Sequence, residues 1–297
     1  MPALLLHLTA IERLAAEASL LPPQVARALD EDLEYARLGA ALPDLPRFQG
    51  MKGAIEPFSP AEAPSRFSQL FHIRAPVLLG LKMAELVSLG ALVGTDAGHA
   101  FVAGYFTHLV IDRALQPIEE RLIERHRSSD ETPRQALARV EWTQALLYLR
   151  EIHGQDLIGT SALRPKFQVL KRHGIPIGGI GGGLYETVRL SCREVLGEAP
   201  LKSDVDQWLR GLYLYGRLLS SPLGKARALP AYSNLSTLEL YRSSEIDIAQ
   251  EITSALDSAR QVLTRLSDFM ERGSFTRRAR ARFLADVPEA VLQPSAA

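Results

Sequence analysis

The chain has 297 residues, of which 46% are hydrophobic, and its 34 basic and 34 acidic residues give a formal net charge of zero at pH 7. A chain of this length can bury one large core or two smaller ones. Its balanced charge provides no global attraction to nucleic acid or to an anionic membrane. Cys192 is the only cysteine, so the sequence excludes internal disulfides and cysteine-rich zinc modules.

Leucine, alanine, arginine and glutamate dominate the chain, and apolar residues recur at spacings of three and four, which predicts helices rather than strands. Prolines and glycines mark several of the expected helix ends. In chain order, we expect helices over residues 2–20, 25–40, 65–73, 76–92, 95–115, 117–127, 133–153, 186–197, 204–219 and 245–272. The proline-rich stretch 43–64 predicts a long loop, and the tail after Val287 is expected to fray.

No internal repeat and no clear linker divides the chain. We therefore expect an all-α protein, with a helical domain over residues 1–230 and a C-terminal helical extension over residues 231–297 packed on it, or one single domain. Charged residues interrupt the apolar stretch 76–111, so no membrane-spanning helix is expected. The N-terminal apolar run lacks a basic start, which argues against a secretory signal, and with the single cysteine it predicts a cytoplasmic protein.

The segment 104–112, Gly-Tyr-Phe-Thr-His-Leu-Val-Ile-Asp, places His108 and Asp112 four residues apart in an apolar stretch with helical periodicity. Residues at this spacing lie about 40° apart around a helix, so both side chains leave the same face. Imidazole nitrogen and carboxylate oxygen are both zinc ligands, and a shared face lets them meet one ion. The alternative is a core histidine hydrogen-bonded to a buried aspartate.

Three further polar residues are expected on apolar elements. His7 lies in the middle of the first predicted helix, and His72 lies between Phe71 and Ile73 in another. Asp44 follows the run Leu-Gly-Ala-Ala-Leu-Pro, and this apolar approach predicts a carboxylate that points inward. Burying so many polar groups without partners is costly, whereas a shared metal ion would satisfy them all.

The order of these residues resembles the zinc-dependent phospholipase C family, an all-helical fold whose superfamily also includes single-strand-specific nucleases. The family pattern has a histidine early in the first helix, an aspartate after a Gly-Ala-x-x-Pro-like run, another histidine, and then Gly-x-x-x-His-x-x-x-Asp. The matching positions are His7, Asp44, His72, His108 and Asp112, followed by Gln116-Pro117. The resemblance spans residues 1–120 and implies a compact multi-helix bundle of the zinc-dependent phospholipase C type.

The chain departs from the family pattern after Pro117. The family has a further histidine directly after this proline, where Ile118 stands, and a His-x-x-x-Glu pair on the next helix. Here Glu141 is preceded four residues earlier by Leu137. The residues that remain as possible replacements are His126, Asp130, Glu141 and His153. The pattern therefore provides ligands for one or two zinc ions and does not support a third.

The resemblance implies hydrolysis of a phosphodiester in a small molecule or a phospholipid headgroup, with His7, Asp44, His72, His108 and Asp112 as zinc ligands. Zinc would bind phosphate oxygens and lower the pKa of a bound water to about 7. Asp44 is expected to orient or deprotonate that water, and Asp112 to bridge two ions. Two alternatives stay open: a non-catalytic helical protein with a degenerate or structural metal site, and a single-strand nuclease, which the balanced charge disfavours.

Two other motifs receive no functional prediction. The glycines of the segment 178–183 lack the third glycine of a dinucleotide-binding loop and the Lys-Ser or Lys-Thr of a phosphate-binding loop, so they predict a tight turn or a close helix crossing. The arginine run over residues 277–282 lies between two phenylalanines and can contact phosphates or lipid headgroups. Acidic residues follow it closely, and the sequence favours a solvated C-terminal segment.

Overall fold

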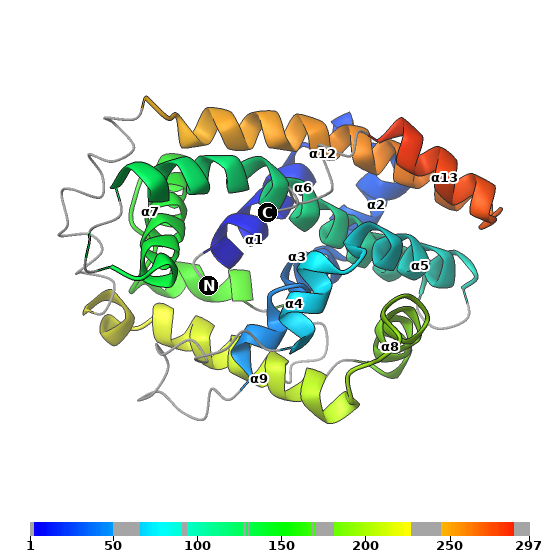
Figure 1. Ribbon diagram of the computed structural model, residues 1–297, viewed down its shortest axis with the longest axis horizontal. Coiled ribbons are helices and arrows are strands. Elements are labelled where there is room, and N and C mark those ends of the chain that lie inside the picture. Colours follow the sequence, from blue (N-terminus) through cyan, green and yellow to red (C-terminus); the bar gives the residue numbers. More distant parts are fainter. Residues whose placement is uncertain are drawn as a thin grey trace.

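The computed structural model describes residues 3–49, 66–90, 94–126, 129, 131–167, 169, 181–226 and 245–287. These residues form α-helices, 3-10 helices (η) and connecting segments, with no β-strand among them (Figure 1). The all-α class predicted from the hydrophobic periodicity is therefore confirmed. Within the same residues, no helix combines the length and the apolar character that crossing a bilayer requires.

The elements follow one another as α1 (Ala3–Ala16), η1 (Ala18–Leu20), α2 (Pro23–Glu31), α3 (Leu33–Ala41), η2 (Leu45–Phe48), α4 (Arg66–Ile73), α5 (Pro76–Ser88), α6 (Thr95–His126), α7 (Pro133–His153), η3 (Ser161–Phe167), α8 (Gly182–Leu196), α9 (Lys202–Leu219), α12 (Ile248–Glu271) and α13 (Arg277–Asp286). The long helix α6 is the centre of the packing, because α2, α3, α5, α7 and α12 all contact it. Figure 1 shows α12 and α9 at opposite edges of the molecule, with α1, α3 and α6 between them.

The helix expected to end at Leu115 instead continues through Pro117 to His126 as part of α6. A proline inside a helix removes one backbone hydrogen bond and costs about 3 kcal/mol. On either side of it, Leu115 and Leu122 are buried in the core, and this continuous apolar face outweighs the lost bond. The helix expected to start at Pro117 is therefore the second half of α6.

The single helix expected over residues 25–40 is divided into α2 and α3 at Asp32, where the backbone leaves helical geometry (φ −129°, ψ 39°). The N–H of Asp32 donates to the carbonyl of Ala28 at 2.9 Å, and its own carbonyl accepts from the N–H of Tyr35 at 2.9 Å. One residue thus closes the first helix and opens the second. The break directs the chain into α3, the helix with the most extensive contact to α6.

Several other predictions concern boundaries. The first helix ends at Ala16 and is followed by η1. The beginning of the expected loop 43–64 forms η2, and the remainder from residue 50 onward lies outside the described residues, as do residues 178–180 and the tail from residue 288. Residues 227–244, which contain the expected domain boundary at 230, also lie outside them. The described helix α12 packs on α6, α5, α7 and α1 and shares their hydrophobic core.

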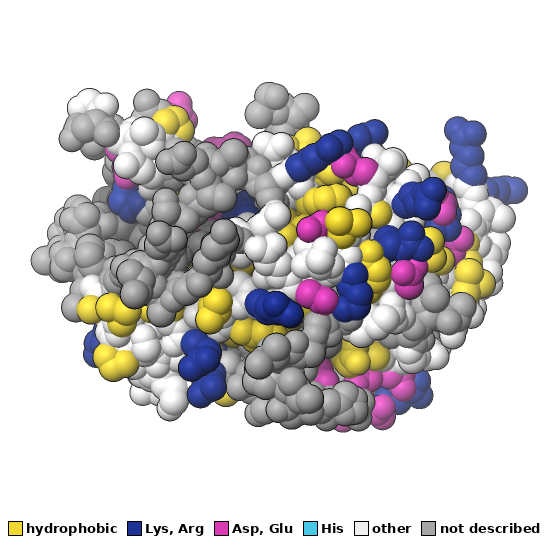
Figure 2. Space-filling view, turned by 90° about the horizontal axis from the view of Figure 1, so that it is seen from below, with side chains coloured by type: hydrophobic (Ala, Val, Ile, Leu, Met, Phe, Trp, Pro, Cys, Tyr) yellow, Lys and Arg dark blue, Asp and Glu magenta, His cyan; other side chains and the backbone are white. Residues whose placement is uncertain are grey.

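The N-terminal half of helix α1 lies inside this core, and its C-terminal half is partly exposed. The side chains of Leu4, Leu5, Leu8 and Ile11 are fully buried, and His7 among them is 1% exposed. A helix that is apolar on every side belongs to the interior of a domain. On the surface, basic and acidic side chains are interspersed over the described part of the face in Figure 2, in agreement with the net charge of zero.

Helices α3 and α6 cross in backbone contact at two glycines. A Cβ added to Gly104 would lie 1.9 Å from the carbonyl oxygen of Ala36, and a Cβ added to Gly39 would lie 1.9 Å from that of Phe101. A side chain at either position would push the two helices apart, so glycine is required at both. His108 follows Gly104 by one helical turn and is therefore held directly against α3.

Substitution of Gly104 by alanine should lower the free energy of unfolding by about 1–3 kcal/mol or more, because overpacking a rigid contact has this cost. Urea denaturation followed by circular dichroism measures the change. Gly182→Ala, in the first turn of α8 with no atom within 4 Å of the added Cβ, is the matched control and should stay within about 0.5 kcal/mol of the parent. Equal stability of the two variants would contradict the proposed contact.

The buried side chain of His99 is expected to make the folded protein less stable in weak acid. Its side chain is 9% exposed, and Nδ1 has no hydrogen-bond partner among the described residues. Burial lowers the pKa of His99 below 6.5; the charge of Asp96 opposes this shift and that of Arg27 adds to it. The unfolded chain thus takes up this proton before the folded chain does, so native stability falls as pH falls below about 6.5.

The slope for this single group is at most about 1.4 kcal/mol per pH unit. His99→Gln carries no titrating ring and should therefore lose less stability than the parent between about pH 7 and about pH 5. Urea midpoints of both proteins at several pH values measure the difference. Parallel pH profiles would show that His99 titrates equally in the folded and unfolded chains.

Candidate metal centre

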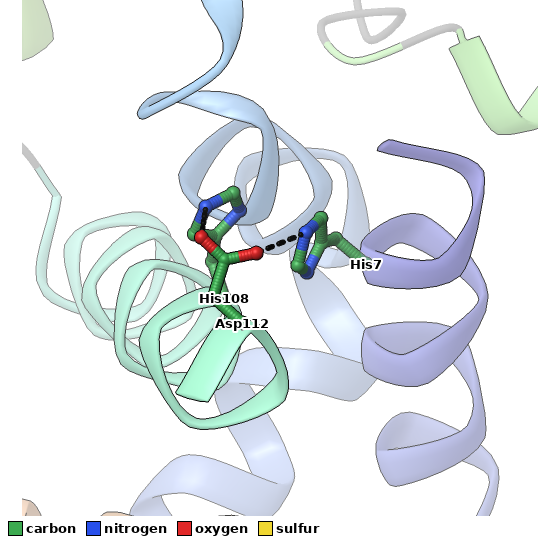
Figure 3. A group of neighbouring side chains, drawn as sticks. All are labelled: His7, His108 and Asp112. Atoms are coloured by element: carbon green, nitrogen blue, oxygen red, sulfur yellow. Dashed lines mark ion pairs between the residues drawn. The ribbon is translucent and has the colours of Figure 1, made fainter. Parts of the chain in front are cut away.

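The five side chains predicted from sequence as metal ligands lie together where α1, α4, α6 and the turn after α3 meet. His7 comes from α1, Asp44 from the turn before η2, His72 from the last turn of α4, and His108 and Asp112 from the middle of α6. We call these five residues the histidine–aspartate centre. Three of them, His7, His108 and Asp112, bring ligand atoms within 4.8 Å of one another (Figure 3).

The carboxylate of Asp112 lies close to all three imidazoles. Its Oδ1 lies 3.0 Å from Nε2 of His7, and its Oδ2 lies 3.2 Å from Nε2 of His108 and 3.4 Å from Nε2 of His72. Figure 3 shows this carboxylate between the rings of His7 and His108. The side chain of Asp112 is 38% exposed whereas that of His108 is fully buried, so the centre is open to solvent at Asp112.

Backbone carbonyls fix the orientation of two of the rings. Nδ1 of His108 donates to the carbonyl of Ala40 at 2.7 Å, and Nδ1 of His72 donates to the carbonyl of Ser68 at 2.7 Å. Because a carbonyl only accepts, Nδ1 carries the hydrogen in both rings and Nε2 is left with the lone pair in the neutral form. The two Nε2 atoms lie 3.3 Å apart. Metal-binding histidines are oriented in this way, by a hydrogen bond at the other ring nitrogen.

His7 is positioned differently from the other two rings. Its ring is stacked on that of His108, with centroids 3.8 Å apart and an interplanar angle of 27°. Both nitrogens of His7 are buried, and neither makes a hydrogen bond with a described residue, although Nε2 is close to Asp112. Buried polar atoms in native proteins are nearly always hydrogen-bonded. The nitrogen of His7 that carries the lone pair is therefore a candidate ligand for a metal ion.

The charges of the centre are coupled. Burial lowers the pKa of His7 and of His72, so both rings favour the neutral form. Burial acts in the same direction on His108, but the charges of Asp112 and Asp44 outweigh it and raise the pKa of that ring. Burial would raise the pKa of Asp112, but His108 and His7 outweigh it and hold that pKa well below its usual range. A proton in the centre therefore resides first on His108, and a cation competes with it.

Arg47, which the sequence reasoning missed, lies beside Asp44. Its Nε is 3.2 Å from Oδ1 of Asp44 and donates to Oγ of Ser68 at 3.2 Å. Burial would raise the pKa of Asp44, but Arg47, together with His108 and His72, outweighs burial and lowers that pKa. Oδ1 of Asp44 also lies 3.6 Å from Nε2 of His72, is buried, and accepts no hydrogen bond from the part of the chain that the structure describes. Asp44 is thus an anionic carboxylate whose Oδ1 is available to accept a hydrogen bond or to bind a cation.

Glu119 and Glu141 add two carboxylates beside the centre. Glu119 follows Asp112 by seven residues on α6 and so shares its face, and Glu141 is buried on α7. Burial raises the pKa of Glu119 well above its ordinary value, and the charges of Glu141 and Asp112 raise it further. The sequence reasoning named Glu141 as a possible replacement and missed Glu119. The seven-residue spacing from Asp112 is the signal that would have found it.

Of the other possible replacements, His153 is not brought to the centre. It is exposed at the end of α7, where Lys166 and Glu12 are its charged neighbours. The side chain of His126 and the whole of Asp130 lie outside the described residues. Ile118, at the position where the family pattern has a histidine, is 2% exposed and packs in the core.

No family model, curated protein or solved structure matches the chain. The resemblance to the zinc-dependent phospholipase C family therefore rests on the order of the five residues in the sequence. The geometry adds that these five residues meet at one place in the fold.

Proposed function

We propose that the chain is a zinc-dependent hydrolase of phosphodiester bonds with a phospholipase C-like centre. The observation that supports this most directly is the orientation of His72 and His108. Each ring is held at Nδ1 by a backbone carbonyl and directs Nε2 toward the carboxylate of Asp112. Lone pairs and carboxylate oxygens directed at one place repel one another unless a proton or a cation lies among them.

The donor set of the histidine–aspartate centre suits zinc. Zinc prefers imidazole nitrogen and carboxylate oxygen, and its catalytic sites use three protein ligands and leave a position for water or substrate. His7, His108 and Asp112 provide such a set. His72 and Asp44 lie close enough to complete it or to hold a second ion, with Asp112 shared between the two. The orphaned buried atoms of His7 and Asp44 would gain a partner.

When bound, zinc polarises a phosphoryl oxygen and lowers the pKa of a coordinated water to about 7. Asp44 is our candidate to orient or deprotonate the attacking water, because it is anionic at neutral pH and its Oδ1 accepts no hydrogen bond from a described residue. Arg47 uses Nε for Ser68, and its remaining N–H groups make no hydrogen bond within the described residues. Those groups can hold a phosphate oxygen, for which the guanidinium fork is well shaped.

A structural metal site is the second candidate function. It is favoured by Ile118 and Leu137, apolar residues at the positions where the family pattern has histidines. A site of this kind would hold zinc through the same ligands and turn over no phosphoester. Metal content alone does not separate the two candidates, whereas metal content and turnover measured together do.

We predict that the purified chain binds at least one zinc ion and that His108→Ala weakens binding by more than about 100-fold, since even the loss of an outer partner of a ligand costs about 10- to 100-fold. Calorimetric titration of the metal-depleted protein measures the affinity. The raised pKa of His108 means that zinc displaces a proton from this ring, so the observed enthalpy should change with the ionisation enthalpy of the buffer.

His153→Ala removes an exposed histidine away from the centre and is the matched control, with zinc affinity expected to equal that of the parent. Zinc bound equally by the His108 and His153 variants would place the ion elsewhere. A parent protein that binds no zinc would refute both the catalytic and the structural candidate.

The zinc-loaded protein should release product from a chromogenic phosphocholine ester. Asp44→Asn should lower kcat by about 100- to 10,000-fold, the usual contribution of a positioned base. Arg47→Gln should raise KM about tenfold, because a charge-assisted hydrogen bond to phosphate is lost. Arg210→Gln, at an exposed position of α9, is the control for removal of one positive charge and should leave both constants unchanged.

Single-stranded DNA is the comparison substrate in the same assay. Cleavage of DNA without release from the phosphocholine ester would make the chain a nuclease. Zinc binding without turnover of either substrate would leave the structural site as the function.

A further inference from the structure

A second candidate site lies where α13 meets the C-terminal end of α12, far along the chain from the residues of the histidine–aspartate centre (Figure 1). A cavity of about 350 Å³ opens between the two helices. The arginine run to which the sequence analysis gave no function contributes to its wall. The lining residues include four arginines and two aspartates, Arg265, Asp268, Arg272, Arg278, Arg282 and Asp286.

Helical spacing explains why these side chains meet. On α12, Arg265 and Phe269 are four residues apart, and Arg272 follows at the turn after the helix, so that all three share one face. On α13, Arg278 and Arg282 are likewise four residues apart. The cavity therefore has one charged wall from each helix.

An aromatic cluster holds the two walls in place. The rings of Phe269 and Phe283 pack edge to face with centroids 5.9 Å apart, and Phe275 from the connecting turn lies 5.3 Å from Phe269. Phe283 also contacts Phe106 of α6, with centroids 5.7 Å apart. Such pairs add to the stability gained from burial alone. The pocket is thus built on the core and does not depend on an exposed helix end.

Among the described residues, the four arginines of this lining have no side-chain partner. None makes an ion pair or a side-chain hydrogen bond with a described residue. In contrast, Arg280, on another face of α13, pairs with Glu85 of α5 and so serves the fold. Four arginines against two aspartates leave the lining with a net charge of +2. Like charges held together in this way repel each other unless an anion is bound.

We propose that the α12–α13 pocket binds a ligand that carries two or more phosphate groups. Guanidinium groups bind phosphate oxygens in a bidentate manner, and several converging forks favour an anion with several charges. The cavity volume lies at the lower end of the range for small-molecule sites. The pocket shares no residue with the histidine–aspartate centre, so either site can be lost without the other.

Inorganic pyrophosphate is the probe, titrated calorimetrically into the full chain in the presence of a chelator so that no metal ion contributes. The parent should bind one pyrophosphate per chain. Arg278→Gln combined with Arg282→Gln should weaken binding about 100-fold, about tenfold for each guanidinium removed. Arg277→Gln combined with Arg210→Gln removes the same charge from exposed positions outside the lining and should change the affinity by less than about threefold.

A second arm distinguishes a free ligand from a lipid headgroup. Phosphatidylcholine vesicles, with and without a phosphatidylinositol bisphosphate, are sedimented with the parent and both double variants. Sedimentation that needs the bisphosphate lipid and is lost only in the Arg278/Arg282 variant assigns the phosphates to a headgroup, and pyrophosphate binding without sedimentation assigns them to a soluble ligand. Equal weakening in both double variants, or a parent that binds neither probe, would overturn the proposal.

Discussion

The backbone contact between α3 and α6 is the constraint on which the rest of the site depends. Because Gly39 and Gly104 carry no side chains, the two helices approach closely enough for Nδ1 of His108 to reach the carbonyl of Ala40. That hydrogen bond directs Nε2 of His108 toward Asp112. The carboxylate of Asp112 also lies close to Nε2 of the other two imidazoles. The close approach of the two helices thus determines the direction in which the Nε2 lone pair of His108 points. The geometry of the site therefore depends on the absence of a Cβ atom at Gly39 and Gly104.

Sequence reasoning was most successful where the relevant geometry is local. The all-α class follows from periodicity, and the shared face of His108 and Asp112 follows from their spacing on one helix. The approach of His7, Asp44 and His72 is set by tertiary packing, and it was predicted from their apolar surroundings and from the resemblance of their order to a known family. Arg47 was missed because its position in the sequence does not tell which residues it meets, whereas the spacing of Glu119 from Asp112 was a signal that went unused.

The errors in the helix boundaries have the same origin. Local rules predicted a helix boundary at Pro117. The burial of residues on both sides of this proline instead keeps the helix continuous. Asp32 shows the reverse case, since no strong breaker marks the division between α2 and α3 in the sequence, and the residue satisfies the ends of both helices. In each case tertiary packing outweighs the local preference, and a single sequence gives little information about packing.

A single carboxylate, that of Asp112, serves three imidazoles, and this has a consequence for how the centre responds to change. Protonation, substitution or ion binding at the carboxylate of Asp112 changes the electrostatic environment of all three rings, because each ring has its Nε2 within 3.4 Å of this carboxylate. The protons of such a cluster leave in steps that belong to the whole assembly. The titration steps of the centre therefore belong to the four groups together, with His108 as the ring that takes up the first proton.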